Sequence, residues 1–381
     1  MYNRYYIIIL LAILFASCGS VRKFNAANPS VKFLNEYIIP DKLQFQQTTV
    51  GGLSGIDYDK KSNVYYVISD DRSNINPARF YTLKFDVSNY KIENLEILRV
   101  DSFRQANGEL YPNKSVMTTI VPDPESIRYY PTQNQLVWSS EGERIINENG
   151  NHILNNPSVN IADKNGKLIY TLPVPPQFVM SDTETGPRRN GVFEGISFTP
   201  DYKTLFVSTE EPLYQDGNNA KPEDGEYWCR IIEYDFANKK PVAQYAYPLD
   251  RVIEKPIPGN AFSVNGIAEI LALDAKRVLV LERSFSMGRI NNNIRIYLAD
   301  LSQAEDITHN NSLKEKPVQK PIHKKLLFSL DSLGTRVDNV EGITFGPTLP
   351  NGNRSLILVS DNNFIGLQKT QILLFDFGMK L

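Results

Sequence analysis

The chain has 381 residues, and its 41 Lys and Arg nearly balance its 43 Asp and Glu, which gives a formal net charge of −2. This balance excludes a protein that binds nucleic acid through a general positive field. A hydrophobic content of 41%, with 20 Tyr and 19 Phe, is sufficient for a large core and is typical of strand-rich proteins.

The first residues have the pattern of an export signal. Arg4 precedes an apolar stretch over residues 5–16 that is too short to span a membrane, and Ala16-Ser17-Cys18-Gly19 ends it. A Cys directly after Ala-Ser resembles the cleavage box of bacterial lipoproteins. We therefore predict a signal peptide over residues 1–18 with Cys18 as the lipidation site, a tether over residues 19–30 and a folded domain over residues 31–381. An ordinary secretory signal with an incidental Cys is the alternative.

Lipidation of Cys18 would determine the location of the protein. A diacylglycerol together with an N-terminal acyl group supplies the two anchors that stable membrane attachment needs. We therefore expect a protein anchored by lipid in the bacterial cell envelope, on the periplasmic or the outer-membrane face.

The rest of the chain repeats one unit: an acidic residue, a strand, a turn and a second strand that ends in acid. In each unit an Ile follows the acidic residue or the Gly or Ser beside it. These isoleucines are Ile56, Ile127, Ile196, Ile270 and Ile343, and their spacings are 71, 69, 74 and 73 residues. Strand units at a nearly fixed period indicate a propeller or a similar circular array.

Each unit offers four strand candidates of alternating or wholly apolar character. In the first unit they cover residues 53–58, 64–69, 79–85 and 95–101, whereas the last unit has only three, at 342–345, 355–360 and 370–377. Residues 32–39 precede the first repeat, and as the outer strand of the last blade they would close the ring and protect its edge. The sequence thus predicts an all-β fold, a single propeller of five four-stranded blades, with six blades as the alternative.

Loop lengths distinguish the two faces of such a propeller. Turns between the first and second strands are short, whereas the loops from second to third strands and the links between blades are long, as at residues 102–124, 142–157, 173–193 and 212–228. Long loops on one face of a rigid scaffold are where binding residues usually lie. The recurring acids belong to this same face.

The innermost strands begin near the central axis, so their acids should converge there. This first set contains Glu125, Glu194, Glu269 and Glu341. A second ring just outside it would contain Asp70, Asp71, Glu141, Glu210, Glu211, Glu282 and Asp361. Carboxylates at short range repel one another unless a proton or a cation intervenes, and such oxygen ligands suit calcium or magnesium.

Arginines beside these acids leave two other interpretations open. Acid and Arg alternate in the sequence, so a ring of salt bridges through Arg72, Arg128, Arg144, Arg283 and Arg289 is the structural alternative to a metal site. The same arginines could instead clamp a phosphate with two hydrogen bonds each. A zinc site with several His ligands is not expected, since the three His, at positions 152, 309 and 323, lie in loops.

Seven short motifs recur around the acids of the repeat units. They are Gly51-Gly52-Leu53-Ser54-Gly55-Ile56, Ile68-Ser69-Asp70-Asp71-Arg72, Asp123-Pro124-Glu125-Ser126-Ile127, Phe193-Glu194-Gly195-Ile196, Leu281-Glu282-Arg283, Asn339-Val340-Glu341-Gly342-Ile343 and Ser360-Asp361-Asn362-Asn363. With these motifs the chain resembles the family called esterase-like activity of phytase, and the resemblance extends from about residue 45 to the end.

The resemblance implies an envelope-bound propeller that hydrolyses a small-molecule phosphate or carboxylic ester. Its metal ligands would be Glu194 and Glu341, then Glu125 and Glu269, around a divalent cation for which calcium is favoured over magnesium. Asp70, Glu210 or Asp361 would be the base, and Arg72 or Arg283 would bind the anion. The alternative is a non-catalytic propeller that binds a protein or a glycan through its long-loop face. We expect a monomer without a nucleic-acid partner.

Overall fold

The computed structural model describes residues 29–116, 121–148 and 150–378. The predicted signal peptide and Cys18 lie outside these residues, as does most of the predicted tether. Within the described ranges, no helix is long and apolar enough to cross a membrane.

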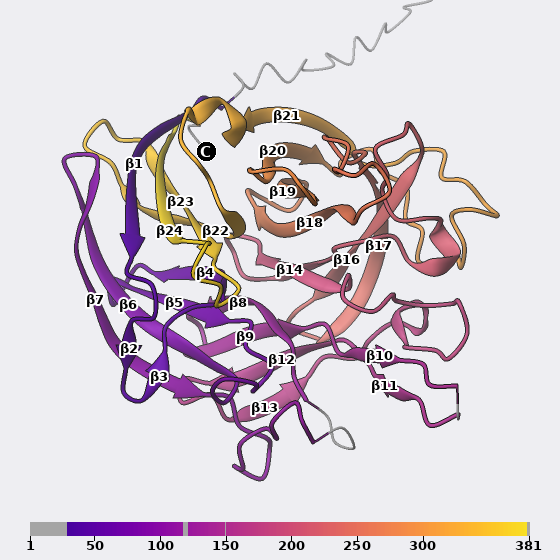
Figure 1. The fold of residues 1–381 in the computed structure, drawn as a ribbon, viewed down its shortest axis with the longest axis horizontal. Coiled ribbons are helices and arrows are strands. Elements are labelled where there is room, and N and C mark those ends of the chain that lie inside the picture. Colours follow the sequence, from indigo (N-terminus) through magenta and orange to yellow (C-terminus); the bar gives the residue numbers. More distant parts are fainter. Residues whose placement is uncertain (1–28, 117–120, 149, 379–381) are drawn as a thin grey trace, which may run out of the picture.

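Five four-stranded antiparallel sheets surround one axis, and they form the β-propeller that the repeat predicted (Figure 1). The first blade contains β4 (Leu53–Asp59), β5 (Val64–Ser69), β6 (Arg79–Ser88) and β7 (Lys91–Ser102). The second contains β8 (Pro124–Tyr130), β9 (Gln135–Ser140), β12 (Ser158–Asp163) and β13 (Leu168–Thr171). The third contains β14 (Phe193–Phe198), β15 (Thr204–Thr209), β16 (Tyr227–Asp235) and β17 (Lys240–Leu249).

The fourth and fifth blades close the ring. The fourth contains β18 (Ser263–Ala272), β19 (Arg277–Ser286), β20 (Asn293–Asp300) and β21 (His323–Ser329). The fifth contains β22 (Asn339–Thr348), β23 (Arg354–Asp361), β24 (Thr370–Phe377) and, on its outer edge, β1 (Val31–Ile39). Val31 pairs with Phe377 and Ile39 with Thr370, so the predicted closure by an N-terminal strand is confirmed.

Shorter elements decorate the loops. Two hairpins lie outside the blades, β2–β3 (Gln44–Phe45, Thr48–Thr49) and β10–β11 (Glu143–Ile145, Ile153–Asn155). Three single turns of 3-10 helix cover Pro176–Phe178, Tyr214–Asp216 and Leu330–Leu333.

The hydrophobic core lies between the blades. One large buried cluster separates each pair of neighbouring blades, and each repeat isoleucine belongs to a different one of these five clusters. All five isoleucines have no exposed surface. The periodic Ile is therefore the residue with which each innermost strand packs against its neighbour, which explains its regular spacing.

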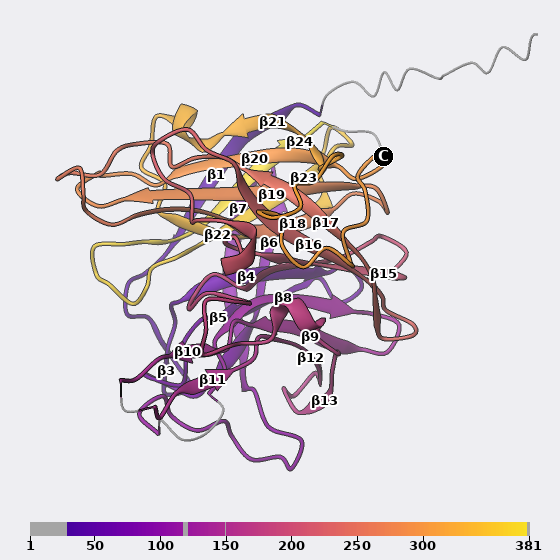
Figure 2. The ribbon, with the colours of Figure 1, turned by 90° about the vertical axis from the view of Figure 1, so that its right-hand side faces the viewer.

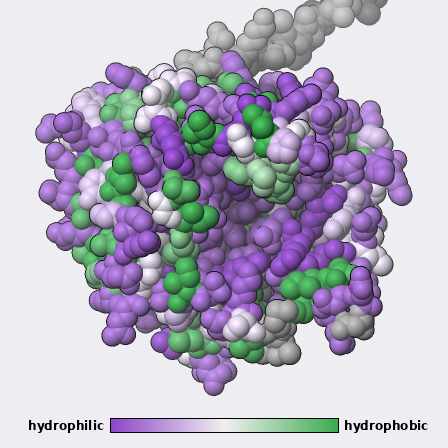
Figure 3. Space-filling view, in the orientation of Figure 1, coloured by the Kyte–Doolittle hydropathy of each residue, from purple (hydrophilic) through white to green (hydrophobic). Residues whose placement is uncertain are grey.

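The two faces of the propeller differ in character. The first-to-second strand turns lie on one face, together with the C-terminal end of the described chain and the start of β1. The opposite face contains the hairpin β10–β11 and the starts of the innermost strands, and the two faces lie on opposite sides in Figure 2. The centre of the face with the strand starts is recessed and hydrophilic (Figure 3). We call this recess the acidic recess, because the predicted acids line it.

Candidate active site

A β-bulge near the start of every innermost strand positions the acids. The pairing with the second strand shifts between Leu53 and Gly55 in the first blade, and at the matching place in the other four. A bulge inserts an extra residue and redirects side chains. In three blades the inserted segment contains a glutamate, namely Glu125, Glu194 or Glu341, and these side chains meet acids from the ends of second strands.

The glycine after Glu194 and the glycine after Glu341 are required by close packing around the axis. A Cβ on Gly195 would lie 2.7 Å from Ser208 Oγ and 2.8 Å from the backbone nitrogen of Ile270 in the next blade. A Cβ on Gly342 would lie 3.0 Å from the backbone oxygen of Ser54. The Glu-Gly-Ile motif thus combines a redirected acid, a position without space for a side chain, and a core isoleucine.

Three groups of carboxylates line the acidic recess, and within each group the potential ligand oxygens lie within 4.8 Å of one another. The groups are Asp70 with Glu341 and Asp361, Asp123 with Glu125 and Glu141, and Glu141 with Glu194 and Glu210. Since Glu141 is common to two groups, the second and third groups adjoin. These acidic groups could hold a metal ion.

One carboxylate in each group has no protein partner. Among the described residues, the side chains of Asp70, Glu125 and Glu194 make no hydrogen bond and no ion pair, although Glu125 and Glu194 are each only 8% exposed. Burial penalises the charge of a carboxylate that has no partner, and a proton or a cation would relieve this penalty.

Burial and mutual repulsion change the acidity of the whole recess. Burial first, and neighbouring carboxylates second, raise the pKa of Asp70, Glu125 and Glu194 well above their usual range. Burial likewise raises the pKa of Glu341 to about 8 and that of Glu210 to about 7, although Arg283 lowers both. Eight acids (Asp70, Asp123, Glu125, Glu141, Glu194, Glu210, Glu341 and Asp361) therefore share the recess with few cations.

Within the described part of the chain, two arginines, Arg72 and Arg283, form ion pairs with acids of the recess. Arg283 Nη2 lies 2.9 Å from Glu210 Oε1 and 3.4 Å from Glu341 Oε1, and these acids hold the pKa of Arg283 above its ordinary value. Arg72 forms an ion pair with Asp123 and lies 3.5 Å from Glu143. Both predicted anion-binding arginines are thus at the recess, and both are already bonded to acids.

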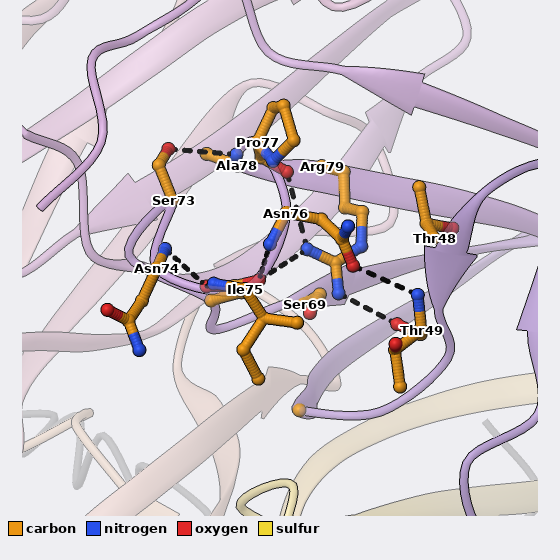
Figure 4. A network of polar contacts seen from close by, with 12 residues as sticks. Thr48, Thr49, Ser69, Ser73, Asn74, Ile75, Asn76, Pro77, Ala78 and Arg79 are labelled. Carbon is orange, nitrogen blue, oxygen red and sulfur yellow. Dashed lines mark hydrogen bonds and ion pairs between the residues drawn. The ribbon is translucent and has the colours of Figure 1, made fainter.

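Other acids of the predicted outer ring have structural roles. Asp71 accepts hydrogen bonds from the backbone nitrogens of Asn74 and Asn76 and lies 2.7 Å from Arg79 Nη1. Arg79 in turn donates to the backbone oxygen of Thr49, which ties β6 to the hairpin β2–β3 (Figure 4). All hydrogen-bonding capacity of Asp71 serves this network, so Asp70 rather than Asp71 is presented to the recess.

Glu269 does not join the acids of the recess. Its carboxylate lies 2.9 Å from Arg128 Nη2 and accepts hydrogen bonds from Ser126 Oγ and from the backbone nitrogens of Ile196 and Ile270. It occupies the position directly before the repeat isoleucine, where the other blades have Gly or Ser, and Ala268 occupies the acid position. A ligand role for Glu269 is therefore not supported by its surroundings.

Arg128 closes the axis beneath the recess. Its guanidinium donates to the backbone oxygens of Ile56, Ile196 and Ile270, so one side chain of the second blade connects the first, third and fourth blades. Around Arg128 and Glu269 the axis contains a salt bridge, as the structural alternative expected. The acidic recess above this pair has an excess of acids. Of the other arginines, Arg144 bonds to backbone oxygens and Arg289 pairs with Glu254.

Sequence reasoning did not select Asp123 as a site residue, although it stands two positions before Glu125. The motif Asp123-Pro124-Glu125 could have indicated this residue. Its two acids flank Pro124, the first residue of the innermost strand β8, and both acids lie at the recess.

Part of the chain is similar to a known protein. A protein of Arthroderma benhamiae described as an uncharacterized secreted protein is 29% identical over 143 residues, which cover 35% of this chain and 28% of that protein. This chain therefore matches less than a third of that relative.

Solved structures show only distant likeness to the chain. A thermostable family-43 glycoside hydrolase has a TM-score of 0.45 at 10% identity, with 90% of this chain and 92% of that chain covered. An exo-β-1,3-galactanase from Phanerochaete chrysosporium has a TM-score of 0.42 at 11% identity, with 89% and 64% covered. Likenesses this distant say nothing about the reaction. By contrast, residues 48–364 match one family along most of the chain, and the protein belongs to that family, described as esterase-like activity of phytase.

Proposed function

We propose that the acidic recess binds a divalent cation, calcium rather than magnesium, and that the protein hydrolyses a phosphate or carboxylic ester there. The observation that carries this proposal is the set of three unpartnered carboxylates, Asp70, Glu125 and Glu194, one in each acidic group. Structural acids of this protein are bonded, as Glu269 and Asp71 are, so three unbonded ones around a single recess favour a ligand.

The donor set fits a hard cation. Within the described residues the potential ligands are carboxylate oxygens, and calcium accepts six to eight oxygen ligands in flexible geometry, whereas magnesium demands a near-ideal octahedron. When bound, the cation would polarise a phosphoryl or carbonyl oxygen and neutralise part of the acid cluster.

Residues of the chain would then act as the base and as the group that binds the substrate anion. Asp70 is the preferred base, because its carboxylate makes no hydrogen bond or ion pair within the described residues and lies beside Glu341 and Asp361. Glu210 and Asp361 are the other candidates, and burial raises the pKa of Asp361 to about 6. Arg283 would orient the anionic group of the substrate, since its Nε is buried without a hydrogen-bond partner.

A non-catalytic role remains the second candidate. The hairpin β10–β11 stands on the same face as the recess and exposes apolar residues, with Leu154 38% exposed and the adjoining Ile146 42% exposed. Exposed apolar side chains beside a polar recess are typical of a surface that binds a protein or a glycan.

The path of the chain gives the proposed lipid anchor a consequence. Val31 pairs with Phe377, which also pairs with Arg354 at the end of the fifth blade opposite the recess. A tether from Cys18 would therefore reach the domain at the face opposite the acids. The recess of an envelope-anchored monomer would then point away from its membrane, toward soluble substrates.

The test is hydrolysis by residues 19–381 of chromogenic phosphomonoesters, phosphodiesters and carboxylic esters. The protein is assayed after metal removal and again with calcium or magnesium restored, beside Glu194→Gln and, as a matched glutamate outside the recess, exposed Glu184→Gln. Cation-dependent turnover that Glu194→Gln loses and Glu184→Gln keeps supports the proposal. A folded protein without turnover on any ester would refute the enzyme and favour the binding propeller.

A further inference from the structure

A large cavity lies at the other end of the axis. It has a volume of about 680 Å³, and its mouth is surrounded by the first-to-second strand turns of the first and third blades, with Asn63 and Tyr202, and by the end of β22, with Pro347. Its floor is formed by the residues that follow the repeat isoleucines, including Asp57, Arg128 and Thr344. The size suits a small organic molecule.

Arg128 and Glu269 separate this cavity from the acidic recess. Arg128 lines the cavity and bonds across the axis to three blades. Asp57, on the floor, accepts hydrogen bonds from the backbone nitrogen of Tyr129 and from Thr344 Oγ1. A ligand in this cavity would therefore meet residues different from those of the recess.

Arg354 is the unusual residue of the cavity wall. Its guanidinium lies over the ring of Phe345, 3.5 Å from the ring centroid, and it makes no hydrogen bond or ion pair with any residue in the described ranges. Arg277 begins the second strand of the fourth blade, as Arg354 does in the fifth, but Arg277 lies 2.7 Å from Asp274. Burial without an anionic partner lowers the pKa of Arg354.

The surroundings of Arg354 restrict the kind of anion. Aromatic side chains of Phe198, Tyr202 and Phe345 line the same cavity and would contact an apolar or aromatic group. One guanidinium matches a carboxylate with two parallel hydrogen bonds. The other cations of the lining are Arg128, which is bonded across the axis, and the exposed Lys60, whereas the carboxylate of Asp57 opposes a doubly charged phosphate.

We propose that this cavity is a second binding site, in which Arg354 binds the carboxylate of a small molecule that also has an aromatic or apolar group. The site is independent of the proposed hydrolysis, because its residues come from the opposite face and do not include the acids of the recess.

The experiment is a calorimetric titration of residues 19–381 with benzoate, with its neutral analogue benzamide and with inorganic phosphate. We expect benzoate to saturate one site with a dissociation constant of about 1 mM, an ordinary value for so small a ligand. Arg354→Gln should weaken benzoate binding by about tenfold or more, since a charge-assisted pair is lost. Arg277→Gln is the matched control and should bind as the unchanged protein does.

Three results would overturn the proposal: no saturable binding of benzoate, equal binding of benzamide, or equal weakening by Arg277→Gln. Phosphate that binds more tightly than benzoate would overturn the carboxylate assignment. If Arg354→Gln fails to fold, a crystal of the unchanged protein soaked in benzoate decides, because the ligand must lie against Arg354. Glu194→Gln should bind benzoate normally, so failure of the hydrolase proposal leaves this test intact.

Discussion

Replacement of Glu194 by Gln should stabilise the metal-free protein, although it changes a buried residue. Glu194 makes no bond that Gln would lose among the described residues, and its potential ligand oxygen lies within 4.8 Å of those of Glu141 and Glu210. The amide has nearly the same shape as the carboxylate and removes one negative charge. Removal of one negative charge from a crowded cluster of acids without a bound cation is expected to raise the stability of the protein.

The expected gain follows from Coulomb's law. Two full charges 4.8 Å apart repel by about 3 kcal/mol at an effective dielectric constant of about 20, and Glu194 faces two such neighbours. Shared protons and the attraction of Arg283 relieve much of this repulsion. We therefore expect a net stabilisation of about 1 to 2 kcal/mol at pH 8, or about 1 to 3 °C in Tm for a chain of this length.

The sign of the effect depends on pH. Folding raises the pKa of Glu194, chiefly through burial and then through Glu210, so ionisation costs stability. The penalty is absent below the unfolded value near 4.5 and grows as pH rises toward the folded value. The advantage of Glu194→Gln should accordingly vanish near pH 4 and increase toward pH 8.

Thermal unfolding of both proteins in chelator, from pH 4 to pH 8, measures this effect. Glu269→Gln is the matched control, because Glu269 is also a buried glutamate but is bonded to Arg128 and to two backbone nitrogens. It should lower the Tm where Glu194→Gln raises it. A lower Tm for Glu194→Gln at pH 8 in chelator, similar to that of Glu269→Gln, would refute the reasoning.

Two further predictions concern the axis and the cation. Arg128→Met should lower the free energy of unfolding by about 3 to 5 kcal/mol, because it leaves Glu269 and three backbone oxygens without their partner. Denaturant unfolding measures this change. A loss below about 1 kcal/mol would contradict the role of Arg128 as the link between blades. Calcium affinity should increase from pH 6 to pH 8, because burial raises the pKa of Glu210 to about 7 and that of Glu341 to about 8, so that binding must displace protons. Titrations in buffers of different ionisation enthalpy detect that release, and an affinity independent of pH would contradict it.

The ring of blades could be predicted from the sequence because the same residue type, isoleucine, recurs at one position in every blade. The repeat isoleucines each enter one of the clusters between blades, so their spacing reports the blade period directly. The closing strand was predictable for a similar reason, since the last unit lacked an outer strand and residues 32–39 lacked a partner.

The candidate site was less predictable, because a shift of one residue decides which acid faces the axis. Glu125, Glu194 and Glu341 stand two positions before their isoleucine, whereas Glu269 stands one position before Ile270. Alignment of the units on the isoleucines would have separated Glu269 from the others. The bulges that redirect the acids, and the choice of Asp70 over Asp71, depend on hydrogen bonds between distant segments that spacing does not reveal.

The most direct test of a cation site in the acidic recess is a crystal structure of residues 19–381 with calcium, with terbium substituted to give anomalous signal. We predict an ion with carboxylate oxygens at about 2.3 to 2.6 Å in at least one of the three acidic groups, in contact with Asp70, Glu125 or Glu194. An ion found only elsewhere on the protein, with the recess unchanged at saturating calcium, would contradict the proposed site.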